Sequence, residues 1–307
     1  MRWPENKEFA FTIFDDTDGA VLEEVSLVYR FLTELGFRTT KSVWVLRAAG
    51  AAFHPGATCE DSDYLAWLKQ IKATGFELGL HNVSAGSSTR DRIEKGLDLF
   101  CHHFGHLPYI HANHSSALEN IYWGLKRFSD PLVRSIYHAL TIRKNRRFHG
   151  DEEGSPYFWG DLCKETIRYV RNLVFKEINT LQMCPEMPYY DPQRPYVNLW
   201  FASSDGGDVE RFIHTLGSID DLQRERGACI IYAHFANGFV SNGRLDPRFI
   251  RVMKDVSERP GWFVPVSQLL DWLKNNRPST EQTISKPSLV RMERRWLLQR
   301  IMAGGTH

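Results

Sequence analysis

The chain has 307 residues, of which 42% are hydrophobic and 24% charged, so it carries enough apolar material for a large buried core. Its 38 basic residues almost balance its 37 acidic residues, which argues against a general nucleic-acid binder. No apolar run approaches the ~18–20 residues that a membrane-spanning helix needs.

The compartment can also be predicted from the sequence. The amino-terminal residues lack the apolar stretch of a secretory signal. The five cysteines are widely spaced and form no C-x-x-C pair, so we expect reduced thiols and no cysteine-based zinc site. A cytoplasmic globular protein is therefore expected, with no nucleic acid among its partners.

Short β-branched or aromatic runs alternate with helical patterns along most of the chain. The expected strands lie at 8–14, 42–46, 76–80, 108–112, 196–201, 229–233 and 262–264. The expected helices lie at 21–32, 64–74, 90–104, 118–127, 131–140, 161–174, 209–216, 247–258 and 266–275. Strands that alternate with helices predict an α/β fold with a parallel sheet and right-handed crossovers.

The carboxyl-terminal part of the chain departs from this pattern. A polar linker begins at 276, so the main domain is expected at 1–275, followed by a linker and helix at 276–307. The helix expected at 287–302 is amphipathic, and arginines flank its apolar stripe. The stripe consists of Leu289, Met292, Trp296, Leu297 and Ile301. Such a helix suits peripheral contact with a membrane, docking on its own domain, or a homodimer. A basic run at 143–147 is expected to be an exposed loop.

Polar residues follow several expected strands, where the reactive groups of parallel α/β folds gather. The candidates are Asp15, Asp16, His81, His111, Asn113, His114, Asp205 and His234. Carboxylates and imidazoles without paired cysteines suit a divalent ion such as Zn²⁺, Co²⁺ or Ni²⁺. Held by one carboxylate and two imidazoles, such an ion keeps a position open for water. Taken singly, each residue is more often a cap or a packing residue, so the prediction rests on their combination.

Three segments resemble the motifs of one family, in that family's order. Phe-Thr-Ile-Phe-Asp-Asp (11–16) resembles the T-F-D-D signature of the NodB-type polysaccharide deacetylases, carbohydrate esterase family 4. Phe-Glu-Leu-Gly-Leu-His-Asn-Val-Ser (76–84) resembles its G-x-E-[IL]-G-x-H-[ST]-x-[ST]-H segment, and Ile-Ile-Tyr-Ala-His (230–234) its L-x-L-H strand. The resemblance spans residues 8–275 and implies a distorted, TIM-like (β/α) barrel of seven strands.

The resemblance also implies roles for individual residues. It makes Asp15 the general base that activates water and His234 the general acid. It makes Asp16 and His81 ligands of a divalent metal.

Departures from the family pattern leave other roles open. The family's second metal-binding histidine corresponds to Ala85, so either metal binding is weakened or lost, or another residue supplies the third ligand. We prefer His114 over His111 for that role, because His114 lies beyond the end of the expected strand. The arginine that holds the catalytic aspartate in many relatives has no evident counterpart, so Asn113 or His111 is expected to orient that aspartate.

Two further candidates lie near the family's fourth motif. Asp205 is expected either to orient His234 or to belong to a loop turn. Trp200 is one of several aromatic side chains that could stack on a sugar, together with Trp123, Trp159, Tyr189 and Tyr190.

Residues and resemblance together lead to two hypotheses. The first is a divalent-metal-dependent hydrolase, with zinc as the expected metal, that removes an N-acyl group from an amino sugar, acetyl being the first candidate. A nucleotide- or lipid-linked saccharide of surface polysaccharide biosynthesis suits a cytoplasmic enzyme, and a lipid-linked one would bring it to the inner face of the membrane. The alternative, which Ala85 favours, is a metal-free saccharide-binding or scaffolding protein on the same fold.

Overall fold

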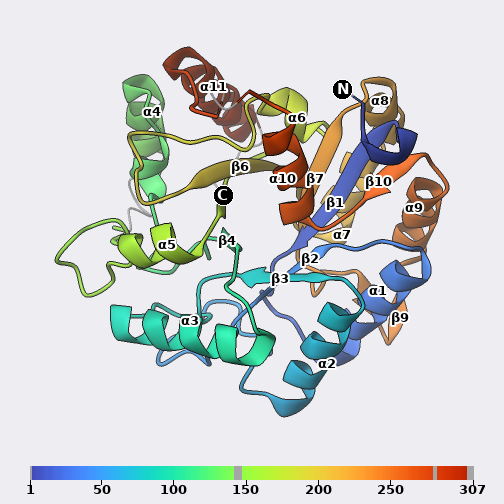
Figure 1. Ribbon diagram of the computed structural model, residues 1–307, viewed down its shortest axis with the longest axis horizontal. Helices are drawn as coiled ribbons and strands as arrows, with labels where there is room; N and C mark the ends of the chain where they lie inside the picture. The colour runs from blue at the N-terminus through green and yellow to red at the C-terminus, as the bar shows by residue number, and fades with distance from the viewer. Residues whose placement is uncertain (1, 142–146, 279–281, 303–307) are drawn as a thin grey trace.

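Seven parallel strands close into a barrel in the computed structural model, which describes residues 2–141, 147–278 and 282–302 (Figure 1). The barrel strands are β1 (Phe9–Asp15), β2 (Thr40–Val43), β3 (Glu77–Leu80), β4 (Ile110–Ala112), β5 (Tyr169–Phe175), β6 (Leu199–Gly206) and β7 (Ala228–Ala233). Each pairs with the next in chain order, and β7 pairs with β1 from Ala10↔Ala228 to Asp15↔Ala233. The predicted fold, a seven-stranded TIM-like (β/α) barrel, is confirmed.

The barrel is distorted where β1 meets β2. These two strands pair only through the last residues of β1, Phe14 and Asp15. The first half of β1 pairs instead with β10 (Gly261–Phe263), which continues the sheet outside the closed ring. A short hairpin of β8 (Val240–Ser241) and β9 (Arg244–Leu245) follows β7.

Helices surround the barrel (Figure 1). They are α1 (Leu22–Glu34), α2 (Ser62–Ala73), α3 (Arg90–Phe104), α4 (Pro131–Thr141), α5 (Gly160–Thr166), α6 (Thr180–Met183), α7 (Val209–Leu216), α8 (Ile219–Arg224), α9 (Pro247–Ser257), α10 (Val266–Asn275) and α11 (Lys286–Met302), with 3-10 turns η1 (Pro4–Asn6) and η2 (Gly124–Arg127). The predicted bounds of α3, α7 and α10 are confirmed, because local caps define helix ends. The α3 helix, for example, ends at Gly105 with φ 75°.

Two predicted helices are wrong. The expected helix at 161–174 is the short α5 followed by strand β5, and most of the expected helix at 118–127 is irregular, ending in η2. The segment Tyr169–Phe175 is buried on both faces, so it shows no polar alternation, and its apolar residues also fit a helical spacing. Its β-branched and aromatic content was the signal for a strand.

The carboxyl-terminal helix packs against its own chain. Four residues of its apolar stripe are buried, namely Leu289, Met292, Trp296 and Leu297, whereas Ile301 is exposed. The buried Glu293 accepts hydrogen bonds from the backbone N–H groups of Ser129 and Asp130, which cap the start of α4. The α11 helix thus packs against α4 and β5 (Figure 1). The helix that directly follows β5 in the chain, α6, is short.

Other expectations about this region stay predictions. The division of the chain after residue 275, the membrane contact and the homodimer are not tested by the fold. The basic run at 143–147 lies, apart from Arg147, outside the described residues. Among the described residues, no helix combines the length and the apolar character needed to cross a membrane.

The packing of α11 predicts unequal effects of two substitutions on one helix. Trp296 is 1% exposed, so Trp296→Ala should lower the free energy of unfolding by about 3–5 kcal/mol, as the loss of a buried aromatic ring does. Leu298 is 60% exposed, and Leu298→Ala should change it by less than about 0.5 kcal/mol. Urea unfolding of both variants measures this, and equal effects would mean that α11 is not docked in solution.

Candidate active site

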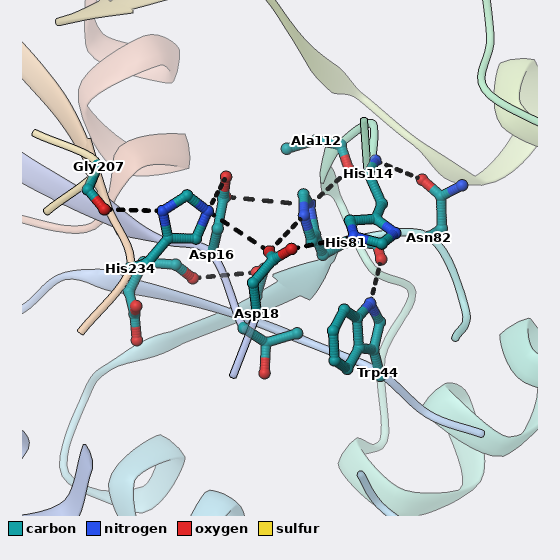
Figure 2. A network of polar contacts seen from close by, with 12 residues as sticks. Asp16, Asp18, Trp44, His81, Asn82, Ala112, His114, Gly207 and His234 are labelled. Carbon is teal, nitrogen blue, oxygen red and sulfur yellow. Dashed lines mark hydrogen bonds and ion pairs between the residues drawn. The ribbon is translucent and has the colours of Figure 1, made fainter. Parts of the chain in front are cut away.

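The end of β1 presents alternate side chains to opposite sides of the barrel wall. Asp15 and Thr17 contact helices, Asp15 accepting a hydrogen bond from the Tyr29 hydroxyl of α1 at 3.2 Å, and Thr17 lying 3.3 Å from the Tyr64 hydroxyl of α2. Asp16 and Asp18 have the opposite orientation and face histidines at the carboxyl-terminal mouth of the barrel (Figure 2). This alternation places Asp15 on the helix side and Asp16 and Asp18 on the mouth side, although all three lie within four residues of sequence.

Both carboxylate oxygens of Asp15 have partners within the wall of the barrel. Its Oδ2 lies 3.0 Å from Lys41 Nζ, and its Oδ1 accepts the backbone N–H of Phe235 at 3.1 Å. Both side chains of the Asp15–Lys41 pair are buried. Burial lowers the pKa of Lys41, but the carboxylate of Asp15 outweighs this effect, so the Lys41 pKa lies above its ordinary value. Asp15 is therefore a structural ion-pair partner in this geometry.

Asp16 is held by an arginine. Arg171 of β5 donates from Nη1 to Oδ1 at 3.0 Å and from Nη2 to Oδ2 at 2.5 Å, while its guanidinium carbon lies 5.1 Å from the Phe14 ring and 4.9 Å from the Tyr232 ring. Burial raises the pKa of Asp16, but the charges of Arg171, His81 and His234 outweigh it and lower the pKa. Asp16 is thus a buried, ionised carboxylate.

An arginine therefore orients an aspartate at this mouth, although the sequence pattern indicated no such arginine and gave Asn113 or His111 the orienting role for the catalytic aspartate. The pattern predicted a helix over β5, so Arg171 was not among the candidate residues. His111 instead lies 3.2 Å from Asn113 Oδ1, and Asn113 exchanges two hydrogen bonds with the backbone of Ile121. Both residues support the loop after β4 and do not contact Asp16.

Asp18 lies between two histidines (Figure 2). Its Oδ2 is 2.9 Å from His81 Nε2, and its Oδ1 is 3.0 Å from His114 Nε2. The other ring nitrogen of His81 lies 3.0 Å from the Ala112 carbonyl, which orients the ring so that Nε2 faces Asp18. Sequence analysis proposed both histidines and missed Asp18, although Asp18 belongs to the same polar cluster after the first strand.

Asp18, His81 and His114 have the donor set of a divalent metal site, one carboxylate and two imidazoles, with ligand atoms within 4.8 Å of one another. Asp18 Oδ2 and His114 Nε2 are buried yet lack a hydrogen-bond partner among the described residues, because their short contacts do not have hydrogen-bond geometry. Ligands of a tetrahedral zinc ion lie about 3.4 Å from one another, close to the separations in this cluster. The residues therefore fit a zinc-like ion.

Surrounding groups hold the two histidines in place. Trp44 donates to the His81 carbonyl at 2.7 Å, and its ring lies 5.5 Å from the ring of His114. Asn82 accepts the backbone N–H of His114 at 3.0 Å and donates to the carboxyl of Glu119 at 3.0 Å. Asn82 keeps this position with a φ of 53°, a left-handed conformation that asparagine tolerates better than most residues.

His234 completes the cluster from the end of β7. Its Nε2 lies 3.5 Å from Asp18 Oδ2 and 3.8 Å from Asp16 Oδ2, and its Nδ1 is 2.9 Å from the Gly207 carbonyl (Figure 2). Burial lowers the pKa of His234, but the carboxylates of Asp18 and Asp16 outweigh it and raise the pKa to about 9. Asp16, Asp18 and His234 form a second group with metal-ligand spacing.

The remaining predicted residues lie outside this cluster. Of the two roles expected for Asp205, its contacts fit a loop turn rather than orientation of His234, and its carboxylate lies 3.0 Å from Arg211. It also accepts the N–H of Gly207 at 3.2 Å and so supports the turn whose carbonyl meets His234. Trp200 is the second residue of β6, far from the carboxyl end of that strand, and its side chain is buried in the core.

Comparisons with known proteins agree with the fold. No protein-family model and no curated protein sequence matches the chain. Among solved structures, a protein provisionally described as a polysaccharide deacetylase from Mycobacterium smegmatis matches with a TM-score of 0.53 and 13% identity, over 94% of this chain and 97% of that one. The Puue allantoinase matches with a TM-score of 0.52 and 11% identity, over 90% of this chain and 94% of that one.

Such low identities show a shared fold. The chain has the same barrel architecture as these two solved structures, and the resemblance found in the sequence is confirmed at the level of the fold.

The carboxyl behind His114 predicts a pH dependence of stability. Burial raises the pKa of Glu119 to about 7, above the ordinary value near 4.5. The folded state therefore holds the proton more tightly, so this contribution to stability is present below about pH 4.5 and is lost as pH rises toward 7. By pH 8 the loss should reach about 3 kcal/mol.

Glu119→Gln should remove most of this loss, because glutamine keeps the acceptor for Asn82 without the charge. Urea unfolding at pH 5 and pH 8 should show a smaller decrease for this variant than for the wild type. Glu258→Gln, at an exposed position, is the matched control and should behave as the wild type does. The same decrease in all three proteins would contradict the assignment.

Proposed function

We propose that the chain is a divalent-metal-dependent hydrolase that removes an N-acyl group, with acetyl as the first candidate, from an amino sugar. The observation that carries the proposal is the convergence of Asp16, Asp18, His81, His114 and His234 at one mouth of a deacetylase-like barrel. The two solved structures of similar fold, described as a deacetylase and an allantoinase, support a hydrolase.

We assign the metal to Asp18, His81 and His114. A bound Zn²⁺-like ion would lower the pKa of water and polarise a substrate carbonyl. The hydrogen bond from His81 to Ala112 and the contacts of Asn82 with His114 would keep both imidazoles oriented toward the ion. His114 supplies the ligand that Ala85 cannot.

The general base in this proposal is Asp16 and not Asp15. Asp16 faces the mouth, and the two hydrogen bonds from Arg171 hold it ionised and oriented, so that it can accept a proton from water. Asp15 has its oxygens engaged by Lys41, Tyr29 and the Phe235 N–H, on the other side of the wall. The family resemblance implied Asp15 as the base and Asp16 as the metal ligand. In this proposal Asp16 is the base and Asp18 is the ligand.

His234 is the general acid. Its Nδ1 lies 2.9 Å from the Gly207 carbonyl, which directs Nε2 toward the two aspartates, and the carboxylate of Asp16 favours the protonated imidazole. From there it can donate a proton to the departing amine.

The substrate and location remain part of the proposal. A nucleotide- or lipid-linked saccharide of surface polysaccharide biosynthesis fits a cytoplasmic enzyme. Contact of α11 with the inner face of a membrane would use the exposed side chains Leu298, Ile301 and Met302, which could equally meet a second copy of the chain.

Metal analysis tests the ligand assignment. Protein purified without chelators and given Zn²⁺ should hold about one ion per chain, and His114→Ala should lose it because two ligands bind far more weakly than three. His111→Gln is the matched control, since His111 lies in strand β4 just before that loop and outside the cluster, and it should keep the ion. If the wild type binds no metal, the alternative of a metal-free saccharide-binding protein replaces the hydrolase.

Substitution of each of the two neighbouring aspartates by asparagine distinguishes their roles. Asp16→Asn should bind Zn²⁺ normally and lose activity on an N-acetylated amino sugar by about 10²–10⁴-fold, the usual contribution of a general base. Asp15→Asn should instead lower the free energy of unfolding by about 3–5 kcal/mol, because it leaves Lys41 buried without a counter-charge. A double change to Asp15→Asn with Lys41→Met should recover stability, and full activity in Asp16→Asn would overturn the assignment.

A further inference from the structure

Two arginines beside the candidate active site have no acidic partner. Arg127 of η2 is 7% exposed and donates to the Asn172 carbonyl at 2.6 Å. Its guanidinium carbon lies 4.0 Å from the Trp123 ring and 5.3 Å from the Trp296 ring. Within the described residues it forms no ion pair, so its charge is met only by a carbonyl, an amide and aromatic faces.

Arg300 of α11 reaches the same place from another element. It donates to the Val174 carbonyl at 3.2 Å, and its guanidinium carbon also lies 5.3 Å from the Trp296 ring. The two arginines therefore share one indole ring, and both bind carbonyls of the same strand, β5. Arg300 likewise forms no ion pair with a described residue, although its helix neighbours Arg294 and Arg295 do.

This arrangement is costly without an anion. Like charges repel, and each guanidinium has five N–H donors of which only one or two are used here. Burial lowers the pKa of Arg127 to about 10, and the nearby charges of Arg300 and Arg171 contribute to that lowering. A bound anion with several oxygens would offset the repulsion and would accept hydrogen bonds from the unused donors.

Both arginines bind the strand that supplies Arg171. Arg127 donates to the carbonyl of Asn172, the residue after Arg171, and Arg300 donates to the carbonyl of Val174. Arg171 in turn holds Asp16 at the mouth of the barrel. A ligand bound by the two arginines would therefore lie against the part of β5 that follows Arg171.

We propose that Arg127 and Arg300 bind a phosphate group of the substrate, so that the amide cleaved belongs to a phosphorylated molecule. Two guanidinium groups match the double charge of a phosphate better than the single charge of a carboxylate. The substrate assignment rests on the proposed function, whereas the anion site itself does not. In this arrangement α11 is part of the binding site as well as of the packing.

Calorimetry with inorganic pyrophosphate tests the anion site on the full chain. Arg300→Gln should weaken binding at least tenfold, since it removes one of two cations. Arg291→Gln removes the same charge from an exposed position of α11 and should bind as the wild type does. Equal thermal stability of the variants excludes a folding effect, and equal affinity in all three proteins, or no binding to the wild type, overturns the site.

Two further comparisons identify the source of the phosphate. N-acetylglucosamine 1-phosphate should bind at least tenfold more tightly than N-acetylglucosamine, and Arg300→Gln should abolish the difference. If pyrophosphate binds but the two sugars bind alike, the site takes free phosphate and the substrate assignment is overturned. Pyrophosphate binding that depends on His114 and not on Arg300 would place the anion at the metal ligands and overturn the proposal. Failure of the proposed function alone would leave Arg300-dependent binding intact.

Discussion

Three carboxylates lie within four residues at the end of β1, and the fold gives each of them a different cationic or metal-ligating partner. Asp15 pairs with Lys41 of β2, Asp16 with Arg171 of β5, and Asp18 with histidines that follow β3 and β4. An ionised carboxylate cannot stay buried without such a partner, so the three residues require contributions from most of the barrel. Closure of the barrel is what brings these strands around one loop.

The alternation of side chains decides which carboxylate meets which partner. A strand cannot present consecutive residues to the same side, so Asp15 must face the helices if Asp16 faces the mouth. The backbone of Asp16 still bonds to Ala233 of β7, which continues the strand geometry past β1 and lets Asp18 face the mouth as well. A consecutive pair of aspartates therefore supplies one structural and one mouth-facing carboxylate, and the second mouth-facing carboxylate is Asp18, two residues further on.

The strand β5 and the helix α11 connect this chemistry to the rest of the molecule. The strand provides Arg171 toward the barrel mouth, and its carbonyls at Asn172 and Val174 accept bonds from Arg127 and Arg300. The helix α11 covers β5 where only a short helix follows it in sequence, and its buried Trp296 lies beside both unpaired arginines. A segment that resembles an appendage in the sequence thus packs against the strand that carries Arg171.

The fold class, many helix bounds and the strand ends that bear His81 and His234 follow from the amino-acid sequence, because they depend on local periodicity and caps. Position alone also favoured His114 over His111 as a metal ligand, and the structure places His114 beside Asp18 and His81. Only the tertiary structure decided that Asp18 joins the histidines and that Arg171 holds Asp16. Those pairings depend on strand twist, side-chain direction and closure between segments up to 155 residues apart, which no local pattern encodes.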